Sequence, residues 1–265
     1  MSPKMYLITL EQTTALSDIL VAVKRLLDAA VPRPSIRLIC DEPGSGFRWS
    51  QLLPAIKALA PMADIWICIL DSSYLASVGK TVYVDRAKKV VDYYGPYKIV
   101  GVECGNEISG TWCGTFKSQS SKVEGAIQAV KRAGFKTAVT YYWDPDYQSR
   151  MYDFIKEYPM VSDHAWLSYY PANAQFETRE LDGIFQMMKV LLPFCRLGFG
   201  EFGTEEFKPA APTPESKALL VKRIHGYRTN LTEFVGVGGY WDFWQDLVSN
   251  GGLKEVWDAF LGWRW

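Results

Sequence analysis

The stretch Gly101-Val102-Glu103-Cys104-Gly105-Asn106-Glu107-Ile108-Ser109-Gly110 joins an apolar segment to a polar segment flanked by glycines. Residues 97–104 have the composition of a buried strand. Asn106 and Glu107 stand where we expect this strand to end and its loop to begin. Polar side chains in loops carried by a rigid core often bind or react with ligands. This stretch is therefore a candidate site for chemistry.

A second stretch, Gly198-Phe199-Gly200-Glu201-Phe202-Gly203, has the same organisation. It is a short apolar strand that ends in a lone carboxylate with small neighbours. Whether Glu201 and Glu107 meet in space depends on the fold of the remaining chain.

The rest of the chain alternates short apolar runs with segments of helical periodicity. The expected strands cover residues 5–10, 35–40, 64–70, 97–104, 136–142, 161–169, 196–202 and 234–243. The expected helices lie at 16–27, 49–60, 82–94, from 121 onward, 147–157, 178–192, 213–227 and 253–261. Eight such units indicate a parallel sheet with helical crossovers. The length of 265 residues is close to the ~250 typical of one (β/α)8 barrel, so we predict an α/β TIM barrel, a single domain over 1–265.

Composition narrows the range of partners. Lys+Arg and Asp+Glu are equal at 29 each, which argues against nucleic acid as a partner. No apolar run approaches the ~20 residues of a membrane span. The first residues lack the features of a signal peptide, so we expect a cytoplasmic protein or a form without its leader. We also expect a monomer. The 10 Trp and 15 Tyr residues suit either a core or flat platforms for sugar rings.

The cysteines and histidines do not form a metal-binding pattern. Five cysteines are widely spaced without a CxxC pair, and His164 and His225 are the only histidines. We therefore expect no zinc cluster and no cofactor. Cys104 and Cys113 could approach each other across their loop, and their pairing stays open at this point.

In a TIM barrel the active site lies at the carboxyl ends of the strands, and polar residues there are the candidates. Several strand ends of this chain resemble those of the clan A, or 4/7, glycoside hydrolases, most closely family 53 endo-β-1,4-galactanases and then family 5 cellulases and mannanases. The matching elements are Arg37, Gly105-Asn106-Glu107, Ser168-Tyr169-Tyr170-Pro171, Gly200-Glu201-Phe202-Gly203 and Tyr240-Trp241.

The resemblance implies a retaining β-glycoside hydrolase that cleaves a β-linked oligosaccharide or polysaccharide, with endo action. Glu201 matches the nucleophile and Glu107 the acid/base. Retention needs these two carboxyl groups about 5–5.5 Å apart. The other residues implied to bind substrate or support the nucleophile are Arg37, Asn106, Trp112, Trp143, Tyr169, Tyr170 and Trp241. Asn106 would bind the sugar 2-hydroxyl, Tyr170 or Tyr169 would orient Glu201, and Trp241 would stack under the cleaved sugar.

Other interpretations remain open from the residues alone. The two glutamates could be structural. Glu103 has the strand parity of Glu107, so it is expected to point into the barrel as part of a supporting network. A phosphate-binding isomerase or aldolase would need glycines in the loops after the strands, whereas residues 236–239 lie within or before the last strand. A non-catalytic sugar-binding barrel would bind without turnover.

Overall fold

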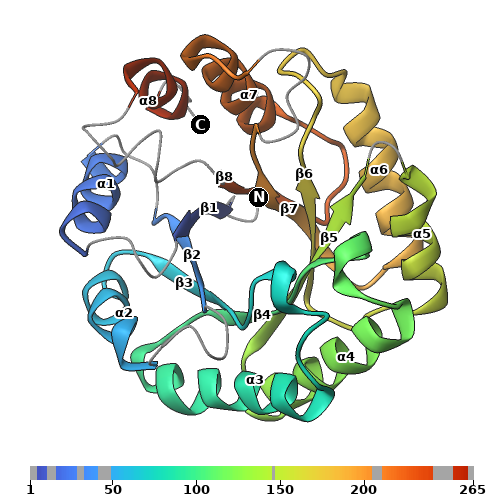
Figure 1. Cartoon of the computed structure of the whole chain (residues 1–265). Helices are drawn as coiled ribbons and strands as arrows, with labels where there is room; N and C mark the ends of the chain where they lie inside the picture. The colour runs from blue at the N-terminus through green and yellow to red at the C-terminus, as the bar shows by residue number, and fades with distance from the viewer. Residues whose placement is uncertain are drawn as a thin grey trace.

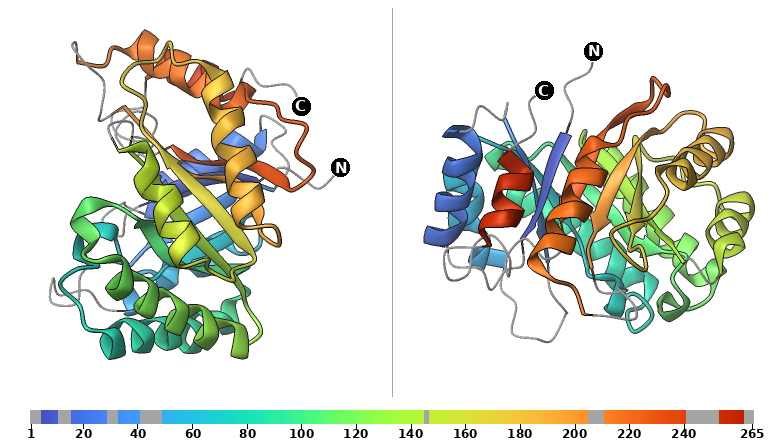
Figure 2. Two further views of the ribbon diagram at one scale, coloured as in Figure 1. Left: turned by 90° about the vertical axis from the view of Figure 1, so that its right-hand side faces the viewer. Right: turned by 90° about the horizontal axis from the view of Figure 1, so that it is seen from above.

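The computed structural model describes residues 5–10, 16–28, 33–40, 49–144, 147–204, 211–240 and 253–261. Its parallel strands form a closed barrel in the order β1 to β8, and β8 pairs with β1. Helices α1 to α8 form a ring around the strands (Figure 1). The side views in Figure 2 show the strands inclined within this ring. The predicted (β/α)8 architecture is confirmed, and the extent of the domain over 1–265 stays a prediction.

The elements alternate along the chain as the periodicity predicts. The strands are β1 Met5–Leu10, β2 Ser35–Ile39, β3 Asp64–Cys68, β4 Gly101–Ile108, β5 Lys136–Trp143, β6 His164–Tyr169, β7 Arg196–Phe202 and β8 Phe234–Tyr240. The helices are α1 Leu16–Asp28, α2 Leu53–Leu59, α3 Lys80–Tyr94, α4 Phe116–Arg132, α5 Gln148–Glu157, α6 Thr178–Leu191, α7 Pro214–Gly226 and α8 Lys254–Leu261.

Strand β4 differs from the prediction at both ends. It begins at Gly101 because residues 95–97 form a short 3-10 helix, and Lys98 then takes a left-handed conformation with φ 60°. It continues to Ile108, which pairs with Tyr141 of β5. Asn106 and Glu107 therefore belong to the strand and not to the loop after it.

The start of α4 also differs from the prediction. The sequence suggests a capping box beginning at Ser121, but the helix starts five residues earlier at Phe116. The Thr115 hydroxyl accepts a hydrogen bond from the Ser118 N–H at 3.2 Å, which caps this end. At α7 the predicted start is confirmed, because Thr213 is the N-cap and Pro214 occupies the first turn.

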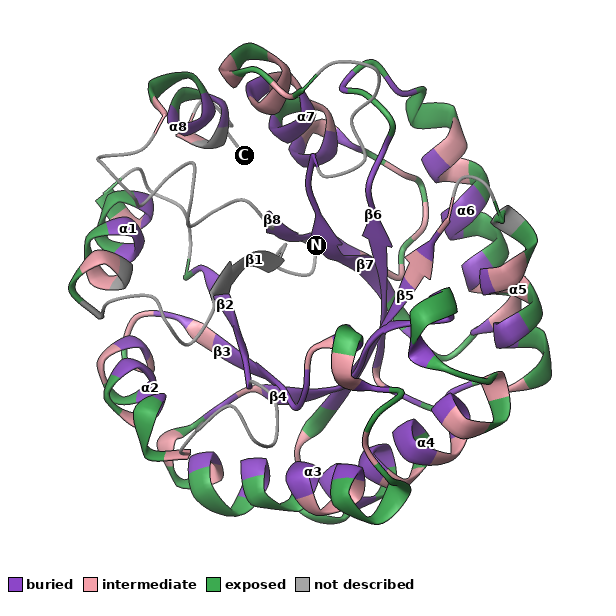
Figure 3. Cartoon of the chain, viewed as in Figure 1, coloured by how far each residue is buried: buried purple, intermediate pink, exposed green. Residues whose placement is uncertain are grey.

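Side chains alternate between the barrel interior and the layer beneath the helices. In Figure 3 strands β2 to β8 are mostly buried, and the helices turn buried faces inward and exposed faces outward. Inside the barrel, Trp66, Ala138 and Trp166 form a separate apolar cluster, with the two indoles 4.9 Å apart edge to face. Thr140 and Ser168 follow on β5 and β6, nearer the carboxyl ends. The apolar filling thus lies toward one end of the barrel and polar residues toward the other.

Two glycines are required by close approach inside the barrel. A Cβ on Gly238 would lie 1.8 Å from the Phe199 carbonyl oxygen, and one on Gly200 would lie 2.5 Å from the Thr140 hydroxyl oxygen. Gly238 of β8 thus lies against the backbone of β7, and Gly200 of β7 lies against a side chain of β5, with no room for a Cβ at either position. Gly238 therefore serves strand packing within β8, in agreement with the expectation that residues 236–239 do not form a loop after the strand.

Two further observations concern the described residues. None of their helices combines the length and the apolar character needed to cross a membrane. Cys104 and Cys113 are both free and buried. The Cys104 thiol faces the Val102 carbonyl, whereas the Cys113 thiol faces the Ser72 and Glu107 carbonyls, so they do not form a disulfide.

The two possible caps of α4 give a matched test of this structure. Thr115→Ala removes the acceptor for the Ser118 N–H and should destabilise the protein by about 1 kcal/mol, lowering the melting temperature by about 2–4 °C. Ser121→Ala lies inside the helix, where alanine is favoured, and should not lower it. A loss of stability in Ser121→Ala alone would contradict the observed helix start.

Candidate active site

The carboxyl end of β4 carries a distorted backbone. The pairing with β5 shifts register between Glu103 and Gly105 and again between Gly105 and Ile108. Glu107 has φ 48° and Ser109 has φ 81°, a conformation that costs a non-glycine residue of order 1–3 kcal/mol. Because of these bulges, Glu103, Asn106 and Glu107 all hydrogen-bond to groups inside the barrel. Such strain, held by the surrounding fold, is typical of functional sites.

The Glu107 carboxyl group lies between two serines. Ser72, just after β3, donates to Oε2 at 2.9 Å, and Ser168 of β6 donates to Oε1 at 2.5 Å. The Glu107 side chain is buried, with 8% of its surface exposed. A hydroxyl group can both donate and accept a hydrogen bond. These two partners therefore suit Glu107 in either protonation state.

The Glu201 carboxylate has partners of a different kind. Nη1 of Arg37 donates to Oε2 at 2.6 Å, and the Tyr170 hydroxyl donates to Oε1. The pairing of β6 with β7 shifts register around Gly200, which accompanies the inward turn of Glu201. Because a guanidinium group can only donate hydrogen bonds, its contact favours the ionised carboxylate.

Arg37 connects the residues of the site to one another. It lies on β2 and is fully buried. Besides Glu201 it donates from Nε and Nη2 to the two oxygens of Glu103, at 2.5 and 3.0 Å. Nη2 also donates to Oδ1 of Asn106 at 2.7 Å. The predicted inward orientation of Glu103 and its place in a supporting network are thus observed.

Burial and charge separate the two carboxyl groups of Glu107 and Glu201. Burial raises the pKa of Glu107 well above its usual value, and the negative charge of Glu201 raises it further, although the two serine hydrogen bonds act the other way. Burial also raises the pKa of Glu201, but the charge of Arg37 and the hydrogen bond from Tyr170 lower it, so that the resulting pKa is about 6. Of the two, Glu201 has a direct positive partner that favours its ionised form, and Glu107 is held toward its protonated form by burial and by the charge of Glu201. One buried acid thus lies near one buried carboxylate.

Aromatic side chains lead from Glu201 toward the surface. The Tyr142 ring lies 6.4 Å from that of Tyr170 and 4.7 Å from that of Trp112, centroid to centroid. Trp112 is 40% exposed. These rings offer apolar faces beside the carboxyl groups, of the kind that sugar rings pack against. Trp112 is thus linked to Tyr170 through the Tyr142 ring, and its role in binding stays a prediction.

Trp143 and Tyr169 lie on the outer side of the barrel wall and not in the site. The indole N–H of Trp143 and the hydroxyl of Tyr169 both donate to Glu180 of α6, at 3.2 and 3.1 Å. Both side chains are buried in the layer between strands and helices. Each is directly adjacent in sequence to an inward-facing tyrosine, Tyr142 or Tyr170, and faces the other way because orientation alternates along a strand. Trp241 lies outside the described residues.

Besides Tyr142, two further contact residues of the site were not predicted from the sequence. Ser72 follows β3 in a short 3-10 helix, where no pattern distinguishes one serine from the next. Thr140 donates to Oε1 of Glu103 at 2.5 Å. Its position on β5, with the parity of Ala138, was the available signal for an inward side chain.

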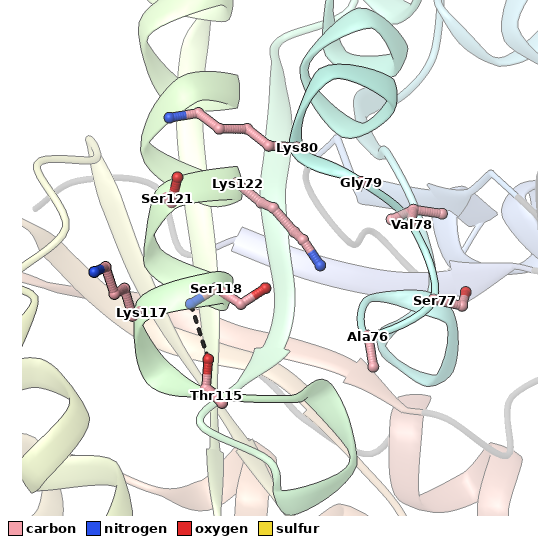
Figure 4. A pocket seen from close by; sticks show the side chains of 10 residues that line it. All are labelled: Ala76, Ser77, Val78, Gly79, Lys80, Thr115, Lys117, Ser118, Ser121 and Lys122. Atoms are coloured by element: carbon pink, nitrogen blue, oxygen red, sulfur yellow. Dashed lines mark hydrogen bonds between the residues drawn. The ribbon is translucent and has the colours of Figure 1, made fainter.

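A groove of about 630 Å³ lies apart from these residues. Figure 4 shows it between the start of α4 and the segment that leads into α3. Its lining consists of lysines, hydroxyl-bearing residues and small residues: Ala76, Ser77, Val78, Gly79, Lys80, Thr115, Lys117, Ser118, Ser121 and Lys122. None of the candidate site residues contributes to it. Elsewhere in the described ranges, no group of three or more His, Cys, Asp or Glu side chains is arranged to hold a metal ion.

Comparison with known proteins supports the fold. No protein-family model matches the sequence, and no curated protein matches it either. Solved structures do match. A glucosidase from Croceicoccus marinus has 14% sequence identity and a TM-score of 0.66, over 98% of this chain and 67% of its own. An endo-β-1,3-glucanase of family GH128 from Amycolatopsis mediterranei, in complex with laminaritriose, has 10% identity and a TM-score of 0.62 over 98% of each chain.

A third similar structure is longer than this chain. Saccharomyces cerevisiae Gas2p, in complex with laminaritetraose and laminaripentaose, has 13% identity and a TM-score of 0.55 over 90% of this chain. This chain spans only 55% of the length of Gas2p. At these identities the three likenesses show a shared barrel fold. The specific resemblance to families 53 and 5 stays a prediction.

The adjacent tyrosines of β6 give a matched test of the site geometry. Tyr170→Phe removes a hydrogen bond that lowers the pKa of Glu201, so this pKa should rise above its value of about 6. Tyr169→Phe removes only the contact with Glu180 and should leave the Glu201 pKa unchanged. Carboxyl ¹³C NMR titration, with Glu201→Gln to assign the signal, measures both. An equal shift in the two variants would contradict the inward orientation of Tyr170.

Proposed function

We propose that this protein is a retaining β-glycoside hydrolase in which Glu201 is the nucleophile and Glu107 the acid/base. The observation that carries the proposal is the difference between the partners of the two glutamates. Arg37 and Tyr170 stabilise an ionised Glu201, whereas Ser72 and Ser168 suit Glu107 with or without its proton. Double displacement needs one carboxylate that attacks and one carboxyl group that first donates and then accepts a proton.

The first step transfers the sugar to the enzyme. Glu201 attacks the anomeric carbon while Glu107 donates its proton to the oxygen of the leaving group. Formation of the ester removes the negative charge of Glu201, so the pKa of Glu107 falls. Glu107 can then take a proton from water, which attacks the anomeric carbon and releases Glu201. The net configuration at that carbon is retained.

The remaining contacts have roles in binding. Nδ2 of Asn106 is buried and has no hydrogen-bond partner in the part of the chain that the structure describes, so it can donate to the sugar 2-hydroxyl. Trp112 and Tyr142 provide ring faces for neighbouring sugar units. Trp241 is proposed, on the resemblance alone, as the platform under the cleaved sugar. Trp143 and Tyr169, buried against α6, are better explained as anchors of that helix.

The substrate class is a β-linked glucan or a related β-linked polysaccharide. Two proteins of similar fold are described with laminari-oligosaccharides, one of them as an endo-β-1,3-glucanase. We therefore place laminarin first in a panel with β-1,4-galactan, mannan, cellulose and xylan, assayed for reducing ends. Endo action predicts a mixture of oligosaccharides early in the reaction. Binding to one of these polymers without any product would instead indicate a non-catalytic barrel.

Azide rescue tests the division of roles between the two glutamates. Glu201→Ala should be inactive on polysaccharide and on activated aryl glycosides alike, because no ester can form. Glu107→Ala should be nearly inactive on polysaccharide but should still release an activated phenol in a burst, because such a leaving group needs no proton. Azide enters on the side of the missing carboxylate, so Glu107→Ala should yield the β-glycosyl azide and Glu201→Ala the α-anomer. Reversed anomers would exchange the two roles, and wild-type rates in both variants would refute the assignment.

The pH dependence of activity follows from the same pair. Activity requires an ionised Glu201 and a protonated Glu107, so kcat/KM should have a bell-shaped profile. Its acid limb should lie near pH 6, the pKa of Glu201. Its alkaline limb should lie higher, because the pKa of Glu107 is raised. With an activated aryl glycoside, Glu107→Ala should lose the alkaline limb and keep the acid limb. If Glu107→Ala instead lost the acid limb and kept the alkaline limb, the proposed protonation states would be contradicted.

A further inference from the structure

Glu103 is a buried carboxylate that does not touch the reacting pair. Its side chain has no exposed surface. Nε and Nη2 of Arg37 donate to its two oxygens at 2.5 and 3.0 Å, and the Thr140 hydroxyl donates to Oε1 at 2.5 Å. A two-point contact between guanidinium and carboxylate fixes the plane of the guanidinium as well as its position. Glu103 therefore determines where the other nitrogens of Arg37 point.

Two further hydrogen bonds of Arg37 reach residues of the candidate site. Nη1 donates to Glu201, and Nη2 also donates to Oδ1 of Asn106. Arg37 has no acceptor atom, so only the amide oxygen of Asn106 can face it. The amide nitrogen must then turn away, and within the described residues it has no partner. The orientation of this donor is thus set by Arg37, and that of Arg37 by Glu103.

We propose that Glu103 is a positioning residue, which acts through Arg37 to hold the Glu201 carboxylate and the Asn106 amide in their reactive orientations. The hydrolytic part of this inference rests on the function proposed above. A buried ion pair is by itself weak evidence for a stabilising role, because apolar residues often replace one without loss. Here the guanidinium of Arg37, which is paired with Glu103, also contacts Glu201 and Asn106. In addition, the absence of a side chain at Gly200 leaves the space in which Thr140 contacts Glu103.

Glu103→Gln tests the proposal with almost no change in shape. A glutamine can accept one bond from Arg37, but its NH2 group opposes the second donor, so the two-point contact is lost. With 4-nitrophenyl β-laminaribioside, or whichever aryl β-glycoside the wild-type protein cleaves fastest, kcat should fall about 100-fold with little change in KM. A merely structural role would lower the melting temperature and leave kcat per folded molecule, KM and the pH profile unchanged. That result would overturn the proposal.

A double-mutant cycle tests whether Glu103 acts through Asn106. Asn106→Ala removes the amide, so Glu103→Gln can disorient nothing further at that position. The double variant should retain at least about tenfold more activity than the product of the two single losses predicts. Glu103→Gln combined with Trp112→Ala is the control, because Trp112 makes no contact with this network, and its losses should multiply. If the activity losses of the single variants multiply in both double variants, Glu103 does not act through Asn106.

A readout without turnover separates this inference from the proposed function. Arg37 lowers the pKa of Glu201 more than the charge of Glu103 raises it, so loss of the positioned Arg37 in Glu103→Gln should raise that pKa above about 6 in a carboxyl ¹³C titration, whereas loss of the Glu103 charge alone would lower it and would contradict positioning. Thr140→Val keeps all charges and removes one donor to Glu103, so it should lower kcat about tenfold and serves if Glu103→Gln does not fold. If the wild-type protein cleaves no glycoside, the proposed function fails. The titration and a crystal structure of Glu103→Gln then decide the positioning, and an unmoved Glu201 pKa with an unmoved Asn106 amide would refute it.

Discussion

The structure of the site depends on one buried cation, the guanidinium of Arg37. A charge taken out of water into a barrel interior is costly unless charged and hydrogen-bonding partners surround it. Glu103 and Glu201 provide the charges, and Asn106 provides a further acceptor. The arrangement around Arg37 therefore holds the Glu201 carboxylate and the Asn106 amide at the same end of the barrel as Glu107. The distortions of β4 and β7 accompany this arrangement.

The same cation explains why two nearby glutamates differ. Burial alone would raise the pKa of both side chains. Glu201 receives a hydrogen bond from Arg37, whereas Glu107 receives its hydrogen bonds from the neutral hydroxyl groups of Ser72 and Ser168. The difference between the two carboxyl groups thus arises from their partners rather than from their depth. Different partners can in this way give two buried carboxyl groups of one barrel different acidities.

Much of this arrangement was predictable from the sequence, since it follows from periodicity. Alternating apolar strands and amphipathic helices predict the barrel, and a barrel brings Glu107 and Glu201, at the ends of their strands, to the same mouth. Strand parity predicts that Glu103 points inward. On β6, Ser168 faces Glu107, so Tyr170, two residues further, also points inward and Tyr169 points outward. On β5, the same alternation places Trp143 on the outer side. The strand alternation was therefore more informative than the residue types.

Other features could not be read from the sequence. The bulges of β4 allow Asn106 and Glu107, which are adjacent, both to reach the site, and this depends on register with β5 and not on local pattern. Ser72 reaches Glu107 from another βα segment, and only the folded barrel brings the two together. The pairing of Arg37 with Glu103 joins strands β2 and β4, which are not neighbours in the sheet. Such contacts depend on side-chain reach across the interior.

The proposed role of Glu201 requires a covalent bond between its carboxylate and the sugar. A 2-deoxy-2-fluoro glycoside with an activated leaving group slows the breakdown of such an intermediate, so that the labelled protein can be digested and the modified peptide identified by mass spectrometry. If Glu201 is the nucleophile, a single adduct should form on its side chain and disappear when the sugar is transferred to a suitable acceptor. An adduct on Glu107, or hydrolysis of the natural substrate with inverted configuration and no adduct, would contradict it.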